Sequence, residues 1–333
     1  MKILAGDIGG TYSRVALCEV DGTSVRRDIQ AVYESRRYDS LEDIAREFAS
    51  EHDVQIDSAC FGVPGPVASR RAIFTNLPWE VDADVLERNL GIPNIALIND
   101  IEAAAHGLAT LPEADFREIR KGSSGVTGNA GLIEAGTGLG EAGMFWDGRR
   151  YRPFASEGGH CDFSPSNERE LELLRFLQAK FGGAHISWER VVSTPGLVHI
   201  YEFLKSKDPE AEPSWLAAEI EAADAATIIV RHALSGESAL CREAALWVLA
   251  LYGAEAGNLA LKYLATGGIY LGTGLAPKLI DLLPESDFLA RFDAKGRLQR
   301  VLQRIAIRVV TNDRVALQGA AFYASQRARG ESV

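Results

Sequence analysis

Residues 3–17, ILAGDIGGTYSRVAL, contain an apolar run that ends at Asp7, then a glycine pair, a threonine and a second run with alternating apolar residues. This order predicts a β-hairpin with a tight glycine turn, and not a strand that leads into a helix. Gly9 and Gly10 allow close backbone approach to a ligand, and exposed amides with the Thr11 hydroxyl can hold phosphate oxygens. Asp7, at the strand end, is placed to hold a water on Mg²⁺. No Gly-Lys-Ser/Thr follows, so this is not a Walker loop.

A second stretch of the same form lies at residues 132–145, LIEAGTGLGEAGMF. Gly136, Thr137 and Gly138 occupy its expected turn, between two apolar runs. An ordinary hairpin turn explains either stretch when it is taken alone. Two such hairpins in one chain indicate two related lobes that face one nucleotide.

A third glycine cluster, TGGIYLGTGLAP, covers residues 266–277. Gly268 precedes a short expected strand, and Gly272 and Gly274 open an expected helix. Close backbone approach to an adenine or a ribose would explain these glycines. The alternative is a strand–turn–helix connection with ordinary turn glycines, which three such loops in this order make less favourable.

The composition excludes several classes of protein. The chain has 333 residues, 47% of them hydrophobic, and this length predicts one or two domains. The net charge of −11 argues against a nucleic-acid surface. The four cysteines form neither a CxxC pair nor a zinc spacing, so we expect a reduced cytoplasmic chain without structural metal. We expect no signal peptide, and no apolar run that approaches the roughly 20 residues of a membrane-spanning helix.

Strands and helices alternate in the first third of the sequence, which is typical of an α/β protein. A loop at 120–129 is expected between the lobes, and the chain after the second hairpin is mainly helical. The expected strands are 58–63, 94–98 and 305–310, and the expected helices are 81–90, 101–111, 167–181, 185–192, 196–205, 214–225, 238–264 and 314–327.

The pair Asn99-Asp100 stands where a strand ends and a helix begins. A carboxylate at a helix N-terminus is held in its ionised form. Asp100 could therefore accept a proton from an attacking hydroxyl group. The alternative reading is a plain helix cap, a place where Asp and Asn are common.

A second polar group is Glu157-Gly-Gly-His160, whose glycines bring an acceptor and a donor close together, as a polyol ligand needs. A core or zinc-ligand histidine is the alternative for His160. Glu189 lies on an expected helix, where a solvated helix face is the alternative. The loop that contains Asn76 and Trp79 adds an amide and an aromatic wall. Amide, carboxylate and imidazole groups fit a sugar better than an apolar ligand.

Together these pieces resemble the bacterial glucokinase family, within the sugar-kinase, actin and Hsp70 superfamily, over nearly the whole chain. The motifs that carry the resemblance occur in family order: GDIGGTYSRVAL, TNLPW, INDIEAAAHGL, AGTGLGEA, SEGGHCDF, ERVVSTPGLV, GNLAL and GGIYLGTGLAPKL. The chain lacks the cysteine-rich zinc motif of the repressor-type sugar kinases, so it resembles the zinc-free branch. The resemblance implies phosphorylation of D-glucose to glucose 6-phosphate by ATP and Mg²⁺, the entry step of glycolysis.

The resemblance also assigns residues to roles. It makes Asp100 the general base. The sugar-binding residues that it implies are Asn76, Asn99, Asp100, Glu157, His160 and Glu189. The nucleotide-binding residues expected from the glycine loops are Asp7, Gly9, Gly10, Thr11, Gly136, Thr137, Gly138, Gly268, Gly272 and Gly274, with Asp7 near the metal through water.

The expected architecture is a two-lobed α/β fold of the ribonuclease H-like type, as in actin-like ATPases and hexokinases, with a central cleft. The small lobe is expected at 1–108 plus 313–333, and the helix-rich large lobe at 109–312. A homodimer that binds glucose and ATP, and neither nucleic acid nor membrane, is expected. A kinase for another hexose and a non-catalytic sugar sensor remain alternatives.

Two positions depart from the family pattern. Thr273 stands where a second glycine pair is common, which bears on nucleotide affinity and donor range. Thr194 follows Ser193 where Gly is usual, which bears on a turn near the sugar.

Overall fold

The computed structural model describes residues 1–52, 54–74 and 77–331. Those residues form two compact units, and each is described by itself below. The first unit contains 1–115, 142–155 and the chain from Asn312 onward, and the second contains 116–141 and 156–311. The predicted lobe limits differ from these units chiefly at 142–155, which belong to the first unit.

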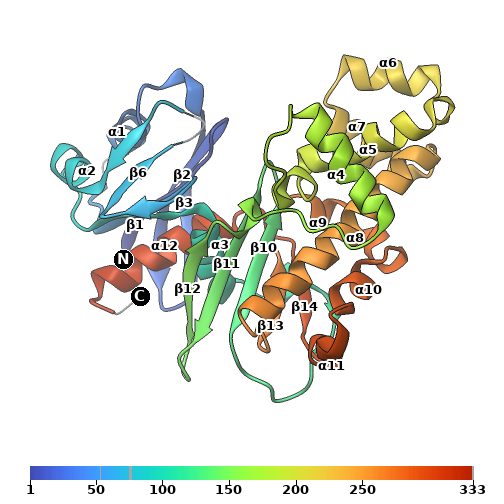
Figure 1. Cartoon of the computed structure of the whole chain (residues 1–333). Helices are drawn as coiled ribbons and strands as arrows, with labels where there is room; N and C mark the ends of the chain where they lie inside the picture. The colour runs from blue at the N-terminus through green and yellow to red at the C-terminus, as the bar shows by residue number, and fades with distance from the viewer. Residues whose placement is uncertain (53, 75–76, 332–333) are drawn as a thin grey trace. The chain divides into compact units, whose positions relative to one another are not determined.

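The first unit is built on a five-stranded sheet flanked by helices (Figure 1). Its elements are β1 (Lys2–Ile8), β2 (Tyr12–Asp21), β3 (Ser24–Glu34), α1 (Leu41–Ser50), β4 (Ser58–Val63), β5 (Val67–Ala68), β6 (Arg71–Ile73), β7 (Glu80–Asp82), α2 (Ala83–Leu90), β8 (Ile95–Asn99), α3 (Asp100–Gly107) and α12 (Val315–Ala328). The sheet order is β3-β2-β1-β4-β8. β1 and β2 are antiparallel neighbours, which confirms the N-terminal hairpin, and β4 and β8 continue the sheet in parallel.

Alternating side chains of β1 cover the two faces of this sheet. Leu4 and Ile8 pack into a core that α1 and α2 help to close. Ile3 and Ala5 face the opposite core, which α12 completes. The parallel strands of this mixed sheet are thus buried on both faces, which is typical of α/β proteins.

The second unit contains most of the helices. Its elements are β9 (Phe116–Arg120), β10 (Ala130–Ala135), the start of β11 (Leu139–Trp146), the end of β12 (Tyr151–Ser156), α4 (Glu168–Lys180), α5 (Thr194–Lys207), α6 (Ser214–Ala222), α7 (Ala225–Ser235), α8 (Ala239–Lys262), β13 (Gly268–Leu271), α9 (Leu275–Lys278), α10 (Phe288–Asp293), α11 (Gln299–Leu302) and β14 (Ile307–Val310). The strand order of its sheet is β12-β11-β10-β13-β14-β9. β13 runs parallel to both β10 and β14, and β9 is antiparallel to β14.

The sequence predictions for single elements have mixed outcomes. The strand at 58–63 is confirmed, and the helices predicted at 167–181 and 314–327 agree with α4 and α12 to within a residue or so at each end. The helix predicted at 185–192 is wrong, because that segment forms only a 3₁₀ turn, Trp188–Arg190. A bridge from Ser187 to Asp162 and the burial of Trp188 hold the segment in an irregular path.

The expectation about membrane spans needs a correction at α8. By length and composition alone, this helix could span a membrane, although we expected no apolar segment of that length. However, 83% of the most apolar 18-residue stretch of this helix is buried inside the protein. A helix that is apolar all round and buried is typical of a protein core, so its hydropathy is weak evidence for a membrane span.

Candidate functional site

The turn of the first hairpin is fixed from behind by Ser35. The Gly9 N–H donates to the Tyr12 carbonyl at 3.0 Å, the Ser35 hydroxyl donates to the Gly9 carbonyl at 2.7 Å, and the Ser35 N–H donates to the Thr11 carbonyl at 3.0 Å. Among the described residues, the N–H groups of Gly10 and Thr11 donate to no protein acceptor. Outward-facing turn amides of this kind form an anion-binding concavity.

Asp7 lies beside this turn, at the end of β1. Its Oδ2 accepts a hydrogen bond from Arg14 at 3.2 Å, and its side chain is 21% exposed. Burial raises the pKa of Asp7, Arg14 lowers it, and Asp313 raises it. No described residue donates to Oδ1, so one carboxylate oxygen remains for a metal-bound water. An oxygen donor next to a phosphate-type concavity fits the preferences of Mg²⁺.

Asn99 and Asp100 stand at the carboxyl end of β8 and begin α3. Asn99 caps the helix, accepting from the Ile101 and Glu102 N–H groups at 3.1 and 3.3 Å, and its side chain is only 4% exposed. Asp100 Oδ1 accepts from the Ile101 N–H at 2.8 Å. The helix cap that we considered as an alternative role for this pair is therefore filled by Asn99. Asp100 lies half-buried in the first turn of α3.

The parallel strands bring Asp7 and Asp100 to one edge of the sheet. Asp7 pairs with Gly62 on β4, and Gly62 pairs with Ile98 on β8. A Cβ on Gly62 would lie 3.5 Å from the Cα of Asp100 and 3.1 Å from the Cβ of Ala103, so this glycine lets α3 approach β4. Ligands of open α/β sheets bind at the carboxyl ends of the strands.

The second hairpin turn repeats the plan of the first. The Gly136 N–H donates to the Gly138 carbonyl at 2.9 Å, and the Thr194 N–H donates to the Gly136 carbonyl at 2.7 Å. No described acceptor receives the N–H groups of Thr137 and Gly138. Thr194 is the position that departs from the family pattern, and its backbone here supports the turn while Ser193 caps α5.

Glu189 contacts this hairpin directly. Its Oε2 accepts the Leu139 N–H at 3.1 Å, and a Cβ on Gly138 would lie 2.5 Å from the same oxygen. Glu189 sits on the 3₁₀ turn and is half-buried, so the solvated helix face that we considered is wrong. The structure therefore places this proposed sugar residue against the proposed phosphate turn.

The loop Gly272–Gly274 meets the same hairpin. Gly274 has a positive φ of 92°, and a Cβ there would lie 2.2 Å from the Ala135 carbonyl oxygen. The Thr273 hydroxyl donates to Glu134 Oε1 at 2.6 Å, and the Thr273 N–H donates to Glu134 Oε2 at 3.1 Å. The second departure from the family pattern thus ties this loop to β10.

Gly268 lies elsewhere. It pairs with Ala130 at the amino end of β10, whereas the turn Gly136–Gly138 follows the carboxyl end of that strand. Its φ of 132° accounts for a glycine at this position. The geometry therefore does not bring Gly268 to the glycine loops.

Thr273 gives the first test. Replacing it with Val keeps the shape and the backbone N–H but removes the hydroxyl donor to Glu134. A hydrogen bond to a charged group contributes about 1.5–3 kcal/mol, so we expect a loss of that order in urea unfolding. If this loop binds the nucleotide, as the sequence predicts, the nucleotide KM should rise severalfold while the sugar KM changes little. An equal rise in both KM values would contradict a role restricted to the nucleotide loop.

The loop with Glu157 and His160 packs beneath the second hairpin. It forms the 3₁₀ turn Gly158–His160, and a Cβ on Gly159 would lie 2.0 Å from the Leu139 carbonyl oxygen. His160 Nε2 lies 3.9 Å from Glu157 Oε2, and both side chains are more than half exposed. His160 is therefore not a core histidine. No group of three or more metal-ligating side chains occurs in the described part of the chain.

Two further expectations concern the TNLPW loop. Asn76 lies outside the described residues. Trp79 is 3% exposed and packs against Phe74 with ring centroids 5.6 Å apart. The aromatic wall that we expected there is wrong, because the Trp79 ring belongs to the core of the first unit.

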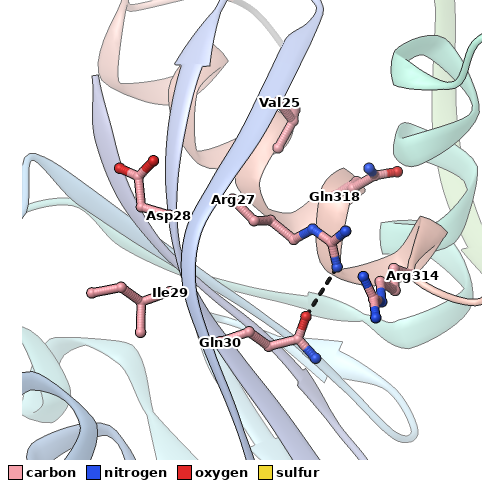
Figure 2. A pocket seen from close by; sticks show the side chains of 7 residues that line it. All are labelled: Val25, Arg27, Asp28, Ile29, Gln30, Arg314 and Gln318. Carbon is pink, nitrogen blue, oxygen red and sulfur yellow. Dashed lines mark hydrogen bonds between the residues drawn. The ribbon is translucent and has the colours of Figure 1, made fainter.

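A pocket in the first unit contains none of the predicted site residues (Figure 2). It lies between β3 and the start of α12, and Arg27 and Arg314 give it a basic lining. The Arg27 guanidinium donates to Gln30 Oε1 at 2.9 Å. This pocket is separate from the candidate site.

Comparison with known proteins identifies the class and the family. The glucokinase family model matches residues 4–327. A glucokinase from Nostoc punctiforme is 38% identical over 337 residues, covering 97% of this chain and 99% of that protein. The crystal structure of a glucokinase from an Antarctic psychrotroph has a TM-score of 0.81 at 27% identity, covering 98% and 99% of the two chains. The crystal structure of a ROK family glucokinase from Streptomyces griseus in complex with glucose and AMPPNP has a TM-score of 0.66 at 20% identity, covering 98% of this chain and 100% of that chain.

The fold is therefore that of the actin-like ATPases and sugar kinases, which confirms the predicted fold class. Two glycine hairpins with outward amides, and an aspartate at a sheet edge, are consistent with that class. The chain belongs to the glucokinase family.

Sequence reasoning missed several supporting residues. Ser35 holds the first turn, Glu134 ties down the Thr273 loop, and the Gly65 carbonyl accepts from Asn99 Nδ2 at 3.2 Å. The glycines and prolines after β4 are a local signal for the Gly65 loop. Ser35 and Glu134 have no such signal, because their partners lie 26 and 139 residues away.

Proposed function

We propose that this member of the glucokinase family, an ATP-dependent glucose kinase, phosphorylates the 6-hydroxyl of D-glucose with Asp100 as general base. The observation that carries the proposal is the placement of Asp100. It is half-buried in the first turn of α3, at the sheet edge that also bears Asp7 and the amide-lined turn. Phosphoryl transfer depends mainly on positioning and electrostatic stabilisation, and a fixed carboxylate can take the proton of the attacking hydroxyl.

The nucleotide is proposed to bind the glycine loops. The turn amides at 9–11 and 136–138 would hold phosphate oxygens, and Gly272 and Gly274 would admit the adenosine. Asp7 would hold Mg²⁺ through water, and a bound Mg²⁺ neutralises charge on the transferring phosphoryl group. Arg14 orients the Asp7 carboxylate through the 3.2 Å hydrogen bond.

The sugar is proposed to bind Asn99, Asp100, Glu157, His160 and Glu189, with Asn76 kept as a prediction from the resemblance. These groups supply paired acceptors and donors, as ring hydroxyls require. A site built to bond hydroxyls rejects analogues that lack them, because its own polar groups are then left unpaired.

Glu157→Ala tests the sugar assignment. We expect the glucose KM to rise by about tenfold or more, since a hydroxyl loses its charged acceptor, while the ATP KM stays nearly unchanged. The control is Glu168→Ala, which removes a carboxylate from the start of α4 that is 70% exposed, against 51% for Glu157. A glucose KM that responds alike in both variants places Glu157 outside the sugar site.

The remaining expectations are also proposals: a homodimer, a cytoplasmic location, the zinc-free branch, and no nucleic-acid or membrane partner. Within the described residues all four cysteines are free, with Cys161 exposed and the others buried. A coupled kinase assay over a panel of hexoses, with and without Mg²⁺, tests the function. Higher kcat/KM for another hexose would favour the alternative substrate, and glucose binding without turnover would favour the sensor.

A further inference from the structure

Glu141 is a carboxyl group that the proposed chemistry does not use. It lies on β11, and its side chain is 1% exposed. Neither carboxyl oxygen receives a hydrogen bond from any described group. A buried charge without donors costs far more than an apolar residue of the same size, so this side chain needs a physical explanation.

Glu141 interacts with a second buried acid, Glu255 of α8, which is 0% exposed. Glu255 has its own donors: Lys262 Nζ at 3.0 Å from Oε1, and Asn258 Nδ2 at 2.8 Å from Oε2. Both oxygens of Glu255 therefore have a donor, whereas neither oxygen of Glu141 has one. Two facing carboxyl groups form a hydrogen bond only if one carries a proton, and that one is Glu141.

The pair lies directly beneath the proposed sugar loop. A Cβ on Gly158 would lie 2.0 Å from Glu141 Oε2, so the backbone of the loop rests on this carboxyl group. The Gly158 N–H donates to Ser156 Oγ at 2.9 Å, and Tyr263, at the end of α8, bonds the same serine. A carboxylate that drew in water or moved away from Glu255 would have to displace Gly158.

We propose that Glu141 is a positioning residue, and that the proton it shares with Glu255 keeps the loop Glu157–His160 in the conformation that binds sugar. This inference rests on the proposed function, because it takes that loop to be part of the sugar site. The proton on Glu141 balances the buried charges, since Glu255 and Lys262 then form a neutral pair.

The titration of Glu141 defines the pH range of this effect. Burial, with the Glu255 charge as a second cause, raises the pKa of Glu141 to about 8, and Lys262 opposes this rise. Tyr252 and Tyr263 are the other titratable groups of α8 that interact with Glu141. Loss of the proton above this pH places two carboxylates beneath Gly158.

The test is calorimetric titration of glucose, without ATP, into the full-length protein from pH 7 to pH 9. If only the protonated state binds, the apparent Kd should rise about tenfold over this range, because the competent fraction falls accordingly. Glu141→Gln should abolish the rise, because its amide does not titrate. Glu255→Gln should move the rise to lower pH, because it removes a charge that raises the pKa of Glu141. All proteins carry Cys161→Ser, so that the exposed thiol beside the loop contributes nothing.

Stability supplies a readout that does not depend on glucose. The folded state holds a proton on Glu141 that the unfolded state releases above a pH near 4.5, so wild-type stability falls as pH rises from about 5 to 8. The melting temperature of Glu141→Gln, relative to that of the wild type, should therefore increase as the pH rises over this range.

A wild-type Kd that stays constant to pH 9 would overturn the inference, and so would a rise that persists in Glu141→Gln. Absence of glucose binding at every pH would refute the proposed function itself. The two failures are distinguishable, because in the first case glucose still binds at pH 7.

Discussion

Asp100→Asn should lower kcat by ~10²-fold or more, because the amide keeps the size of the side chain but cannot take the proton of the attacking hydroxyl. Glucose binding should remain measurable by calorimetry, since an amide still makes hydrogen bonds and Asn99 still caps α3. Pre-steady-state measurement of product formation separates this chemical step from product release.

Glu102→Gln is the matched control for Asp100. Glu102 lies two residues further along α3, and burial raises its pKa, so it is a second carboxyl group with an unusual environment. It takes no part in the proposed chemistry, and its change should leave kcat within about twofold of the wild type, as is usual away from the reacting groups. Comparable losses in both variants, or near wild-type turnover of Asp100→Asn, would remove Asp100 from its role as base.

Asp7→Asn should reduce kcat on the order of 10²-fold, because it removes a charge that would hold Mg²⁺ near the transferring phosphoryl group. Glucose binding in the absence of nucleotide should be unchanged. The concentration of Mg²⁺ that gives half-maximal activity should rise, which is measured by titrating the metal at saturating ATP.

Asp313→Asn is the control for Asp7. Its carboxylate acts electrostatically on Asp7 but is 76% exposed, so solvent screens it and its loss should matter little. Full activity in excess chelator would contradict metal assistance altogether. An unchanged Mg²⁺ requirement in Asp7→Asn would place the metal on other residues.

The hairpins were predictable because their signals are local. Alternating apolar residues on both sides of a glycine pair specify a turn and two strands within fifteen residues, and β1 and β2 confirm this prediction. The helix cap at Asn99 was likewise predictable, because its signal lies in adjacent residues. The roles of the site residues remain predictions, since they concern ligands.

The parts that were not predictable depend on contacts between distant segments. Glu189 reads as part of a helix because its neighbours have helical spacing, but its carboxylate instead accepts the Leu139 N–H, 50 residues away. Trp79 looks like a ligand wall in a polar loop until Phe74 and the sheet core cover it. The return of 142–155 to the first unit has no local signature.

The close packing of α12 on α3 also constrains when the first unit can form during synthesis. A Cβ on Gly319 would lie 1.7 Å from the Ala103 carbonyl oxygen, and a Cβ on Gly107 would lie 2.0 Å from that of Val315. Leu317 and its neighbours on α12 complete one face of the β1 sheet (Figure 1). The ribosome must therefore have synthesised and released α12 before the helix that bears Asp100 acquires this packing partner. A nascent chain that has not yet reached α12 therefore holds Asp100 on a helix that lacks one of its packing surfaces.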